Sequence, residues 1–437
     1  MPHRHHRKLS CSKAGHAQRR PSKLGRAQVG HYVRAVSEPT TSGSAFRARH
    51  FGLVWFSGLI WHMCRWGVAF LGTFLINDLT GSPRLVQLAG TVLYAPLLVG
   101  GVIGGVISDR LDRLTTVRSQ MLLVVPLAAA IGLLVRSDRI EVWMIYGFMF
   151  IVGLGWVSDM TSRRALVFDL VGEERLDNAM AMEALSLSLG MALGALVGGY
   201  AVDAVGVGSS YLVIAGLSVA GFIALLPVRS PERKQVARRS TPAQDLRDGL
   251  AMARRNTSLL SILGMTVIAN FFLFTYFPII PARGDDLDAG PFLVGLLAAG
   301  TGIGMMTGSL LFARLDLRPR GKIYVSGIVF GMLMLIPFAL VGTYPLALAA
   351  IIVSGIGSGL FGATQSTLVM HAVTEEMRGR ALGLMSMAIG ALPLGMYVLG
   401  EVAEQIGVSS AIVTSALIGL VVLAYWRHRR PEVWAMP

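Results

Sequence analysis

The sequence is poor in cysteine and in charged residues. Its 437 residues include two cysteines, and Asp, Glu, Lys and Arg together make up only 15%. Cys11 lies in a polar stretch and Cys64 in an apolar run, so they form neither a disulfide framework nor a C-x-x-C metal pattern. Soluble domains carry about 25% charged residues. The low charge, with 53% hydrophobic residues and a mean hydropathy of +0.60, indicates a multi-pass membrane protein.

Motifs for enzymatic chemistry are missing as well. The sequence contains no G-x-x-x-x-G-K-[ST] phosphate loop, no H-E-x-x-H zinc pattern and no G-x-S-x-G nucleophile pattern. We therefore expect a protein that is not an enzyme, holds no metal and uses no cofactor. Without ATP hydrolysis in this chain, any work it does must draw on a gradient.

Apolar runs long enough to cross a bilayer recur along the whole chain. A span needs about 20 apolar residues, and each span is expected to be a helix because lipid offers no partners to an open backbone. This predicts an all-α membrane protein with twelve transmembrane helices. The predicted spans are 51–77, 86–108, 119–135, 140–160, 180–203, 208–228, 258–282, 291–314, 322–341, 345–370, 380–402 and 409–427.

Basic residues lie almost entirely in alternate loops. Of the 39 Lys and Arg residues, only Arg84, Arg136, Arg139 and Arg283 fall on the opposite side, and Arg65 falls within a span. By the positive-inside rule, both termini are expected in the cytoplasm of a cell that carries the protein in its inner or plasma membrane. The net charge of +14 is then a topology signal, and we expect no binding to nucleic acid.

Sequence repeats divide the chain into two similar halves. Leu166, Val171 and Glu174 recur as Leu368, Val373 and Glu376 with the same spacing, 202 residues later. Such internal similarity predicts two six-helix bundles in parallel orientation. The predicted segments are a disordered basic cytoplasmic tail 1–48, an N-terminal bundle 49–228, a cytoplasmic linker 229–257 with an amphipathic helix near 245–254, a C-terminal bundle 258–428 and a short tail 429–437.

A dense group of charges follows the second predicted span. Gly105, Asp109, Arg110 and Arg113 form a G-x-x-x-D-R-x-x-R pattern between spans 2 and 3. With twelve spans in two halves and a long central loop, this pattern resembles the loop signature of the major facilitator superfamily. The D-R-x-D-R form, LTGSP at 79–83 and EEMRGRALGL at 375–384 resemble the branch that contains the enterobactin exporter and macrolide efflux proteins.

That resemblance implies a gating role for the charged loop. Asp109 is expected to face the start of span 11, and Arg110 or Arg113 is expected to pair with Asp159 at the cytoplasmic end of span 4. These contacts would form and break in every transport cycle. A plain solvated loop is the simpler alternative.

Glycines recur at every fourth residue in the fifth predicted span. Gly190, Gly194 and Gly198, followed by Gly199, resemble the superfamily's antiporter motif, although Ala195 stands where that motif has proline. Helices in lipid associate through such small residues, so tight helix packing explains the same pattern without any bearing on the direction of transport.

Ionisable residues inside spans are costly and are by default candidates for function. Arg65 lies near the middle of span 1, where it is expected to contact substrate or to form a buried structural pair. Glu183, more than a turn into span 5, is the candidate for proton exchange; a helix N-terminal acid favoured by the dipole is the alternative. Asn270 in span 7 and Gln365 in span 10 are expected to face the same cavity, or to bond between helices. Glu401 and Glu404 are expected to be solvated at the outer end of span 11.

These features favour a secondary active transporter. We expect proton-coupled efflux of small apolar or amphipathic molecules, drugs or siderophores, by alternating access of the two halves. An organic-anion importer or exchanger, with Arg65 holding the anion, is one alternative; a non-transporting receptor or scaffold is another. The expected partners are a small-molecule substrate, a proton or other ion gradient and the lipid bilayer, and the expected state is a monomer.

Overall fold

The protein is described by a computed structural model over residues 44–98, 112–229, 242–315, 317–374 and 377–436. Within these ranges every regular element is a helix. The α-helices are α2 (Phe51–Thr80), α3 (Pro83–Tyr94), α5 (Arg113–Arg136), α6 (Val142–Val171), α7 (Leu176–Val205), α8 (Val207–Leu225), α9 (Pro242–Arg255), α10 (Thr257–Phe272), α11 (Ile280–Asp285), α12 (Pro291–Leu315), α13 (Arg320–Leu340), α14 (Tyr344–His371), α15 (Arg378–Ile389), α16 (Ala391–Ile406) and α17 (Val408–Arg429). Short 3₁₀ turns are η1 (Ala45–Arg47), η2 (Glu173–Arg175), η3 (Phe277–Ile279) and η5 (Pro431–Ala435).

Eleven of the twelve predicted spans recur as helical segments long and apolar enough to cross a membrane, among the residues described. The remaining prediction, 86–108, begins within α3, and its second part, 99–111, lies outside the described residues. The all-helical class is confirmed. The described residues neither confirm nor contradict the count of twelve.

Polar residues at the ends of the apolar runs set where several helices begin and end. Ser82 caps α3 by accepting from Leu85 N, Asp112 caps α5 by accepting from Thr115 N at 2.8 Å, and Asn256 caps α10. Such side chains supply acceptors for otherwise unpaired N–H groups. Gly81 ends α2 in the left-handed conformation, with φ of 61°, which glycine adopts without steric cost.

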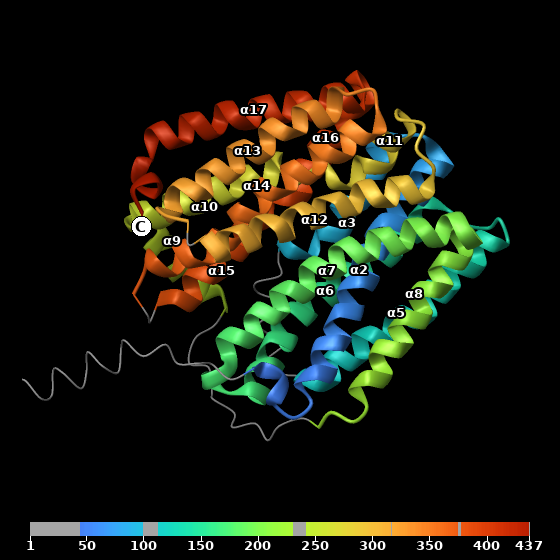
Figure 1. Cartoon of the computed structure of the whole chain (residues 1–437), viewed down its shortest axis with the longest axis horizontal. Helices are drawn as coiled ribbons and strands as arrows, with labels where there is room; N and C mark the ends of the chain where they lie inside the picture. The colour runs from blue at the N-terminus through green and yellow to red at the C-terminus, as the bar shows by residue number, and fades with distance from the viewer. Residues whose placement is uncertain (1–43, 99–111, 230–241, 316, 375–376, 437) are drawn as a thin grey trace, which may run out of the picture. The chain divides into compact units, whose positions relative to one another are not determined.

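Helix α2 lies at the centre of the N-terminal half, which we define as residues 49–228. It packs against α3, α6, α7 and α8, and α5 packs against α8. In the C-terminal half, residues 258–428, α14 lies between α12 and α13. Figure 1 shows the blue-to-green helices and the orange-to-red helices as two groups. Contacts from α7 to α12 and from α3 to α16 join them.

The seventh span is interrupted near its middle. Helix α10 ends at Phe272, and the chain resumes as η3 and α11 after the intervening residues. Pro278 and Pro281 lie in these two short elements, and proline cannot donate the backbone bond that a continuous helix requires. The interruption places Phe277 beside α2, because η3 packs on that helix.

Candidate functional site

Arg65 is fully buried at the midpoint of α2. Its side chain is 1% exposed, and it is the fifteenth residue of a 30-residue helix. At about 1.5 Å per residue, this places the residue roughly 20 Å from either helix end, beyond the reach of snorkelling. The guanidinium carbon lies 4.1 Å from the ring centre of Trp66 and 4.2 Å from that of Trp156 on α6. A further side-chain hydrogen bond joins Arg65 to Tyr94 on α3.

Trp66, Trp156 and Tyr94 contact this guanidinium, and Phe277 packs on Trp66; we call these four side chains the aromatic box. Trp66 meets Phe277 edge to face at 4.9 Å, and Tyr94 meets Trp156 in the same manner at 5.5 Å. Phe277 belongs to the C-terminal half, whereas the other three belong to the N-terminal half. The box therefore spans both halves of the chain.

Arg65 forms no ion pair within the described part of the chain, and its Nε and Nη1 atoms have no hydrogen-bond partner there. The Nε1 atom of Trp66 is also buried without a partner. Cation–π contacts with two indoles contribute about 2 kcal/mol or more each when desolvated. They stabilise the cation without using its N–H groups, which stay available to an acceptor.

A second buried arginine, Arg163, lies on α6 about two turns C-terminal to Trp156 and is paired with a carboxylate. Arg163 donates from Nε to both carboxylate oxygens of Asp159, at 3.0 and 3.1 Å, and from Nη2 to Oδ1 at 2.8 Å. Both side chains are 2% exposed, and Nη1 of Arg163 donates to the Val54 carbonyl. Asp159 is thus held by Arg163 and leaves the nearby Arg65 without a carboxylate.

The predicted gating contacts lie only partly within the described residues. Gly105, Asp109 and Arg110 fall outside them. Arg113 pairs with Asp169 and donates to the Ala165 carbonyl at 3.1 Å. Arg113 starts α5, and Asp169 lies near the end of α6, whereas Asp159 is ten residues further inside, about 15 Å along the helix. In this structure Arg113 therefore reaches Asp169 instead of Asp159.

Glu183 on α7 lies close to the paired arginine. Its charge interacts with those of Arg163 and Asp159, and its Oε1 atom is buried without a hydrogen-bond partner. Glu183 is half-buried, and its helix also forms the main contact with α12 of the other half. The structure therefore groups Glu183 with Asp159 and Arg163.

Asn270 and Gln365 belong to a separate network inside the C-terminal half. Asn270 Nδ2 donates to the Thr266 carbonyl at 2.9 Å, and Gln365 Nε2 donates to Thr266 Oγ1 at 3.1 Å. Tyr324 completes the network through its hydroxyl, 2.8 Å from Thr266 Oγ1. The bond from Gln365 is interhelical, which was the alternative to a cavity role, whereas the bond from Asn270 stays within α10. The network includes neither Arg65 nor Glu183.

The repeated glycines of α7 lie against two different helices. A Cβ at Gly190 would lie 2.3 Å from His62 Cβ, and one at Gly194 would lie 2.5 Å from the Met63 carbonyl oxygen, both on α2. Further along, a Cβ at Gly199 would lie 2.7 Å from the Pro291 carbonyl oxygen on α12. These positions allow backbone contact within the first half and between the two halves.

The two halves are also joined by polar contacts at one end of α3. Arg84 Nε lies 2.9 Å from Glu401 Oε1, and Glu404 Oε2 accepts from Ser82 Oγ at 2.8 Å and from Arg84 N at 3.2 Å. Nearby, Asn77 Nδ2 donates to Asp285 Oδ2 at 2.6 Å. We call these contacts the Arg84 clasp. Glu404 is exposed and Glu401 partly so, as expected at the outer end of span 11, and both also bind groups of the other half.

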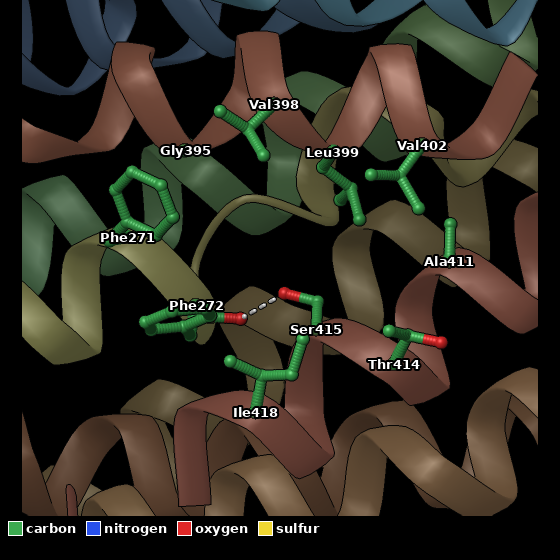
Figure 2. A pocket seen from close by; sticks show the side chains of 10 residues that line it. All are labelled: Phe271, Phe272, Gly395, Val398, Leu399, Val402, Ala411, Thr414, Ser415 and Ile418. Atoms are coloured by element: carbon green, nitrogen blue, oxygen red, sulfur yellow. Dashed lines mark hydrogen bonds between the residues drawn. The ribbon is translucent and has the colours of Figure 1, made fainter. Parts of the chain in front are cut away.

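A small apolar pocket lies among α10, α16 and α17. Figure 2 shows Phe271, Val398, Leu399 and Ile418 around it, with Ser415 donating to the Phe272 carbonyl at 3.5 Å. None of the predicted site residues lines it, and its lining carries no ionisable group. This pocket offers apolar contact alone.

Several of these residues were absent from the sequence-based predictions. Trp66, Trp156 and Phe277 lie in apolar runs where tryptophan and phenylalanine are common. Only the fold reveals that the two indoles contact Arg65 and that Phe277 packs on Trp66. Arg163 was placed in a loop because span 4 was ended at residue 160. Its spacing of four residues from Asp159 could have indicated an ion pair on one face of a helix.

Buried charges at mid-helix, two helical halves and polar contacts between them define a multi-pass membrane transporter. The sequence pattern of the Major Facilitator Superfamily matches residues 54–393 and 263–435, so the chain belongs to that superfamily. Its relatives and its family are transporters and not enzymes.

The relatives at sequence level are efflux proteins. Macrolide efflux protein A of Streptococcus pyogenes is 23% identical over 359 residues, covering 77% of this chain and 85% of that protein. Enterobactin exporter EntS of Shigella flexneri is 28% identical over 396 residues, covering 82% and 89%. The resemblance to this branch is thereby confirmed.

Solved transporters share the fold at low sequence identity. A bacterial homologue of the human lysosomal transporter Spinster superimposes with a TM-score of 0.67 at 14% identity, covering 89% of this chain and 97% of that one. A POT family transporter in complex with 5-aminolevulinic acid gives a TM-score of 0.70 at 12% identity, covering 88% and 97%. These similarities establish the fold only.

Proposed function

We propose that this transporter exports small amphipathic molecules by proton-coupled alternating access. The observation that carries the proposal is Arg65, a fully buried cation with two unpartnered N–H-bearing atoms, inside an aromatic box built from both halves. A site between two halves changes its access when the halves rock against each other. The efflux relatives support the outward direction.

Glu183 is the proposed proton-exchanging group. It has one unpartnered carboxylate oxygen, and Arg163 and Asp159 act on its charge. Helix α7 carries it and packs against both α2 and α12, so a change of charge at Glu183 acts on helices of both halves. Protonation there would bias the relative position of the halves.

The Arg84 clasp is the proposed outer closure. With both termini in the cytoplasm, the positive-inside rule places Arg84 on the outer side. Glu401, Glu404 and Asp285 of one half then hold the other half closed outward in this structure. On the inner side, the charged loop with Gly105, Asp109 and Arg110 is proposed to form the opposing closure.

Cell accumulation assays test this function. Macrolides, siderophores and amphipathic dyes are presented to cells with and without the protein, each with and without a protonophore. Export predicts lower accumulation of at least one compound when the protein is present, with the difference removed by the protonophore. Equal accumulation in all four conditions would remove the proposal, and higher accumulation with the protein would indicate an importer.

A further inference from the structure

We propose that the transported molecule is an aromatic organic anion, whose oxyanion binds Arg65 and whose ring packs in the aromatic box. This inference rests on the proposed function and names its substrate class. It covers carboxylates and phenolates attached to a flat ring. The argument has three parts: the charge, the rings and the position of the site.

Among the described residues, no carboxylate forms an ion pair with Arg65, although the charge of Asp159 acts on it from a longer distance. The proposal uses four ionisable groups of this half: Arg65, Arg163 and Asp159 are buried, and Glu183 is half-buried. Asp159 is occupied by three hydrogen bonds from Arg163, and Arg163 also acts on the charge of Glu183. Breaking a buried pair or leaving a buried charge alone is strongly destabilising. An anionic ligand would therefore provide the ion-pair partner that Arg65 does not find among the described residues.

The acids nearest Arg65, Asp159 on α6 and Glu183 on α7, lie beside Arg163, and the groups beside Arg65 itself are neutral. On α2 these are Trp66 and His62, the latter with an unpartnered Nδ1; on α3 it is Tyr94 and on α6 it is Trp156. None of these supplies a negative charge in its usual state near neutral pH. The polar groups that face inward are mostly donors, which suits an acceptor-rich anion and disfavours a cation.

The rings of the aromatic box favour a flat, apolar ligand body. Aromatic pairs attract each other beyond the effect of the area they bury. Trp66 and Trp156 already lie against the guanidinium, and Phe277 and Tyr94 extend the aromatic wall from α3 to η3. A ligand that joins a ring to an oxyanion matches both the walls and the cation.

The site is closed in this structure. The unpartnered Arg65 atoms have almost no accessible surface, so a ligand reaches them only after a ring moves. Trp66 is held by Phe277 of the other half, so separation of the halves frees it. Closure of the site is thereby linked to the relative position of the halves.

Binding to the purified full chain in lipid nanodiscs tests this class of ligand. Isothermal titration at pH 7.5 compares 2-naphthoate with neutral 2-naphthamide and with saturated decahydro-2-naphthoate. We expect 2-naphthoate to bind at least tenfold more tightly than either. Equal affinity for the acid and the amide would overturn the role of charge, and equal affinity for the flat and saturated acids would overturn the role of the box. These comparisons use the wild-type protein and depend on no variant folding.

Variants then assign the binding to Arg65. Arg65→Gln is expected to weaken the binding of 2-naphthoate at least tenfold and the binding of 2-naphthamide less than twofold. Arg65→Lys is expected to retain part of the affinity for 2-naphthoate. Arg136→Gln is the control, because Arg136 is exposed and bonds Ser209 within its own half. Unchanged 2-naphthoate affinity in Arg65→Gln would overturn the proposal. If the protein exports compounds but does not prefer 2-naphthoate, the proposed function stands and the substrate class is wrong. If it prefers 2-naphthoate but exports nothing, the substrate class stands as a ligand class and the proposed function is wrong.

Discussion

At the scale of single residues, the buried arginines Arg65 and Arg163 differ in their partners. Arg163 is bound to Asp159 by three hydrogen bonds, whereas Arg65 rests against indole rings with two unpartnered nitrogens. A paired buried arginine stabilises its surroundings only while its partner is present. An unpaired one is retained at a cost, which is the expected signature of a binding residue.

Removing the partner of Arg163 should destabilise the N-terminal half. Asp159→Asn leaves a buried guanidinium without a counter-charge, at an expected cost of about 3–5 kcal/mol. The melting temperature of the purified protein, followed by intrinsic fluorescence, measures the loss. Asp169→Asn is the matched control, because its pair with Arg113 is partly exposed, at 27% and 21%, and is expected to cost far less. Equal losses in the two variants would contradict this reading of the buried pair.

Glu183→Gln should uncouple transport from protons. The amide keeps the size of the side chain but carries no exchangeable proton, so efflux from vesicles is expected to stop responding to an imposed pH gradient. Glu141→Gln, at the exposed start of α6, is the control and should keep the full response. A Glu183→Gln protein that still follows the gradient would place proton exchange elsewhere.

At the scale of helices, hydropathy predicted where the spans lie but not all of their ends. Eleven predicted spans coincide with helical segments, because lipid forces long apolar runs into helices. Helix α6 runs to Val171, past the predicted end at residue 160, since Asp159 neutralises Arg163 one turn away and lets the helix continue as a buried element. The interruption of span 7 was also missed, although Pro278 and Pro281 signalled it.

The candidate site was less predictable than the helices. Arg65 and Glu183 stand out in the sequence because charge is rare in spans. The aromatic box joins residues as far apart in the sequence as Trp66 and Phe277, and no local sequence pattern predicts a contact between residues so separated. Asn270 and Gln365 were left with two interpretations, since polar residues in a span also arise from hydrogen bonding within or between helices.

Close packing of α7 on α2 should depend on Gly194. A Cβ there would lie 2.5 Å from the Met63 carbonyl oxygen, which cannot move without shifting the backbone of α2. Gly194→Ala is therefore expected to lower the melting temperature by several degrees and to reduce transport. Gly216→Ala is the matched control, because a Cβ at Gly216 meets nothing within 4 Å. Similar stability of both variants would show that α2 and α7 can separate freely.

At the scale of the whole molecule, the account describes two halves joined by the Arg84 clasp and by the contact of α7 with α12. The ion pair of the clasp, Arg84 with Glu401, is partly exposed, and such ion pairs contribute about 0.2–1 kcal/mol. Weak contacts suit a closure that opens in every cycle, because small energies then shift the balance between the two states.

Weakening the clasp should open the outer side. In a background with Cys11 and Cys64 replaced by alanine, Thr91→Cys reports access between α3 and α16, since Thr91 bonds the Pro393 carbonyl at 3.3 Å. Adding Arg84→Gln and Glu404→Gln together is expected to raise the labelling rate by an impermeant maleimide severalfold. Arg136→Gln, which breaks a bond within one half, should leave the rate unchanged. A rate unaffected by the clasp variants would contradict this closure.

The most direct test of the central claim is transport by purified Arg65 variants. Inside-out vesicles with an acidic interior receive a compound that the efflux assay has identified, and its uptake rate is measured. We predict that wild-type protein accumulates the compound, that Arg65→Ala inserts normally but transports at least tenfold more slowly, and that Arg65→Lys recovers part of the rate. Wild-type rates in Arg65→Ala vesicles would contradict the account.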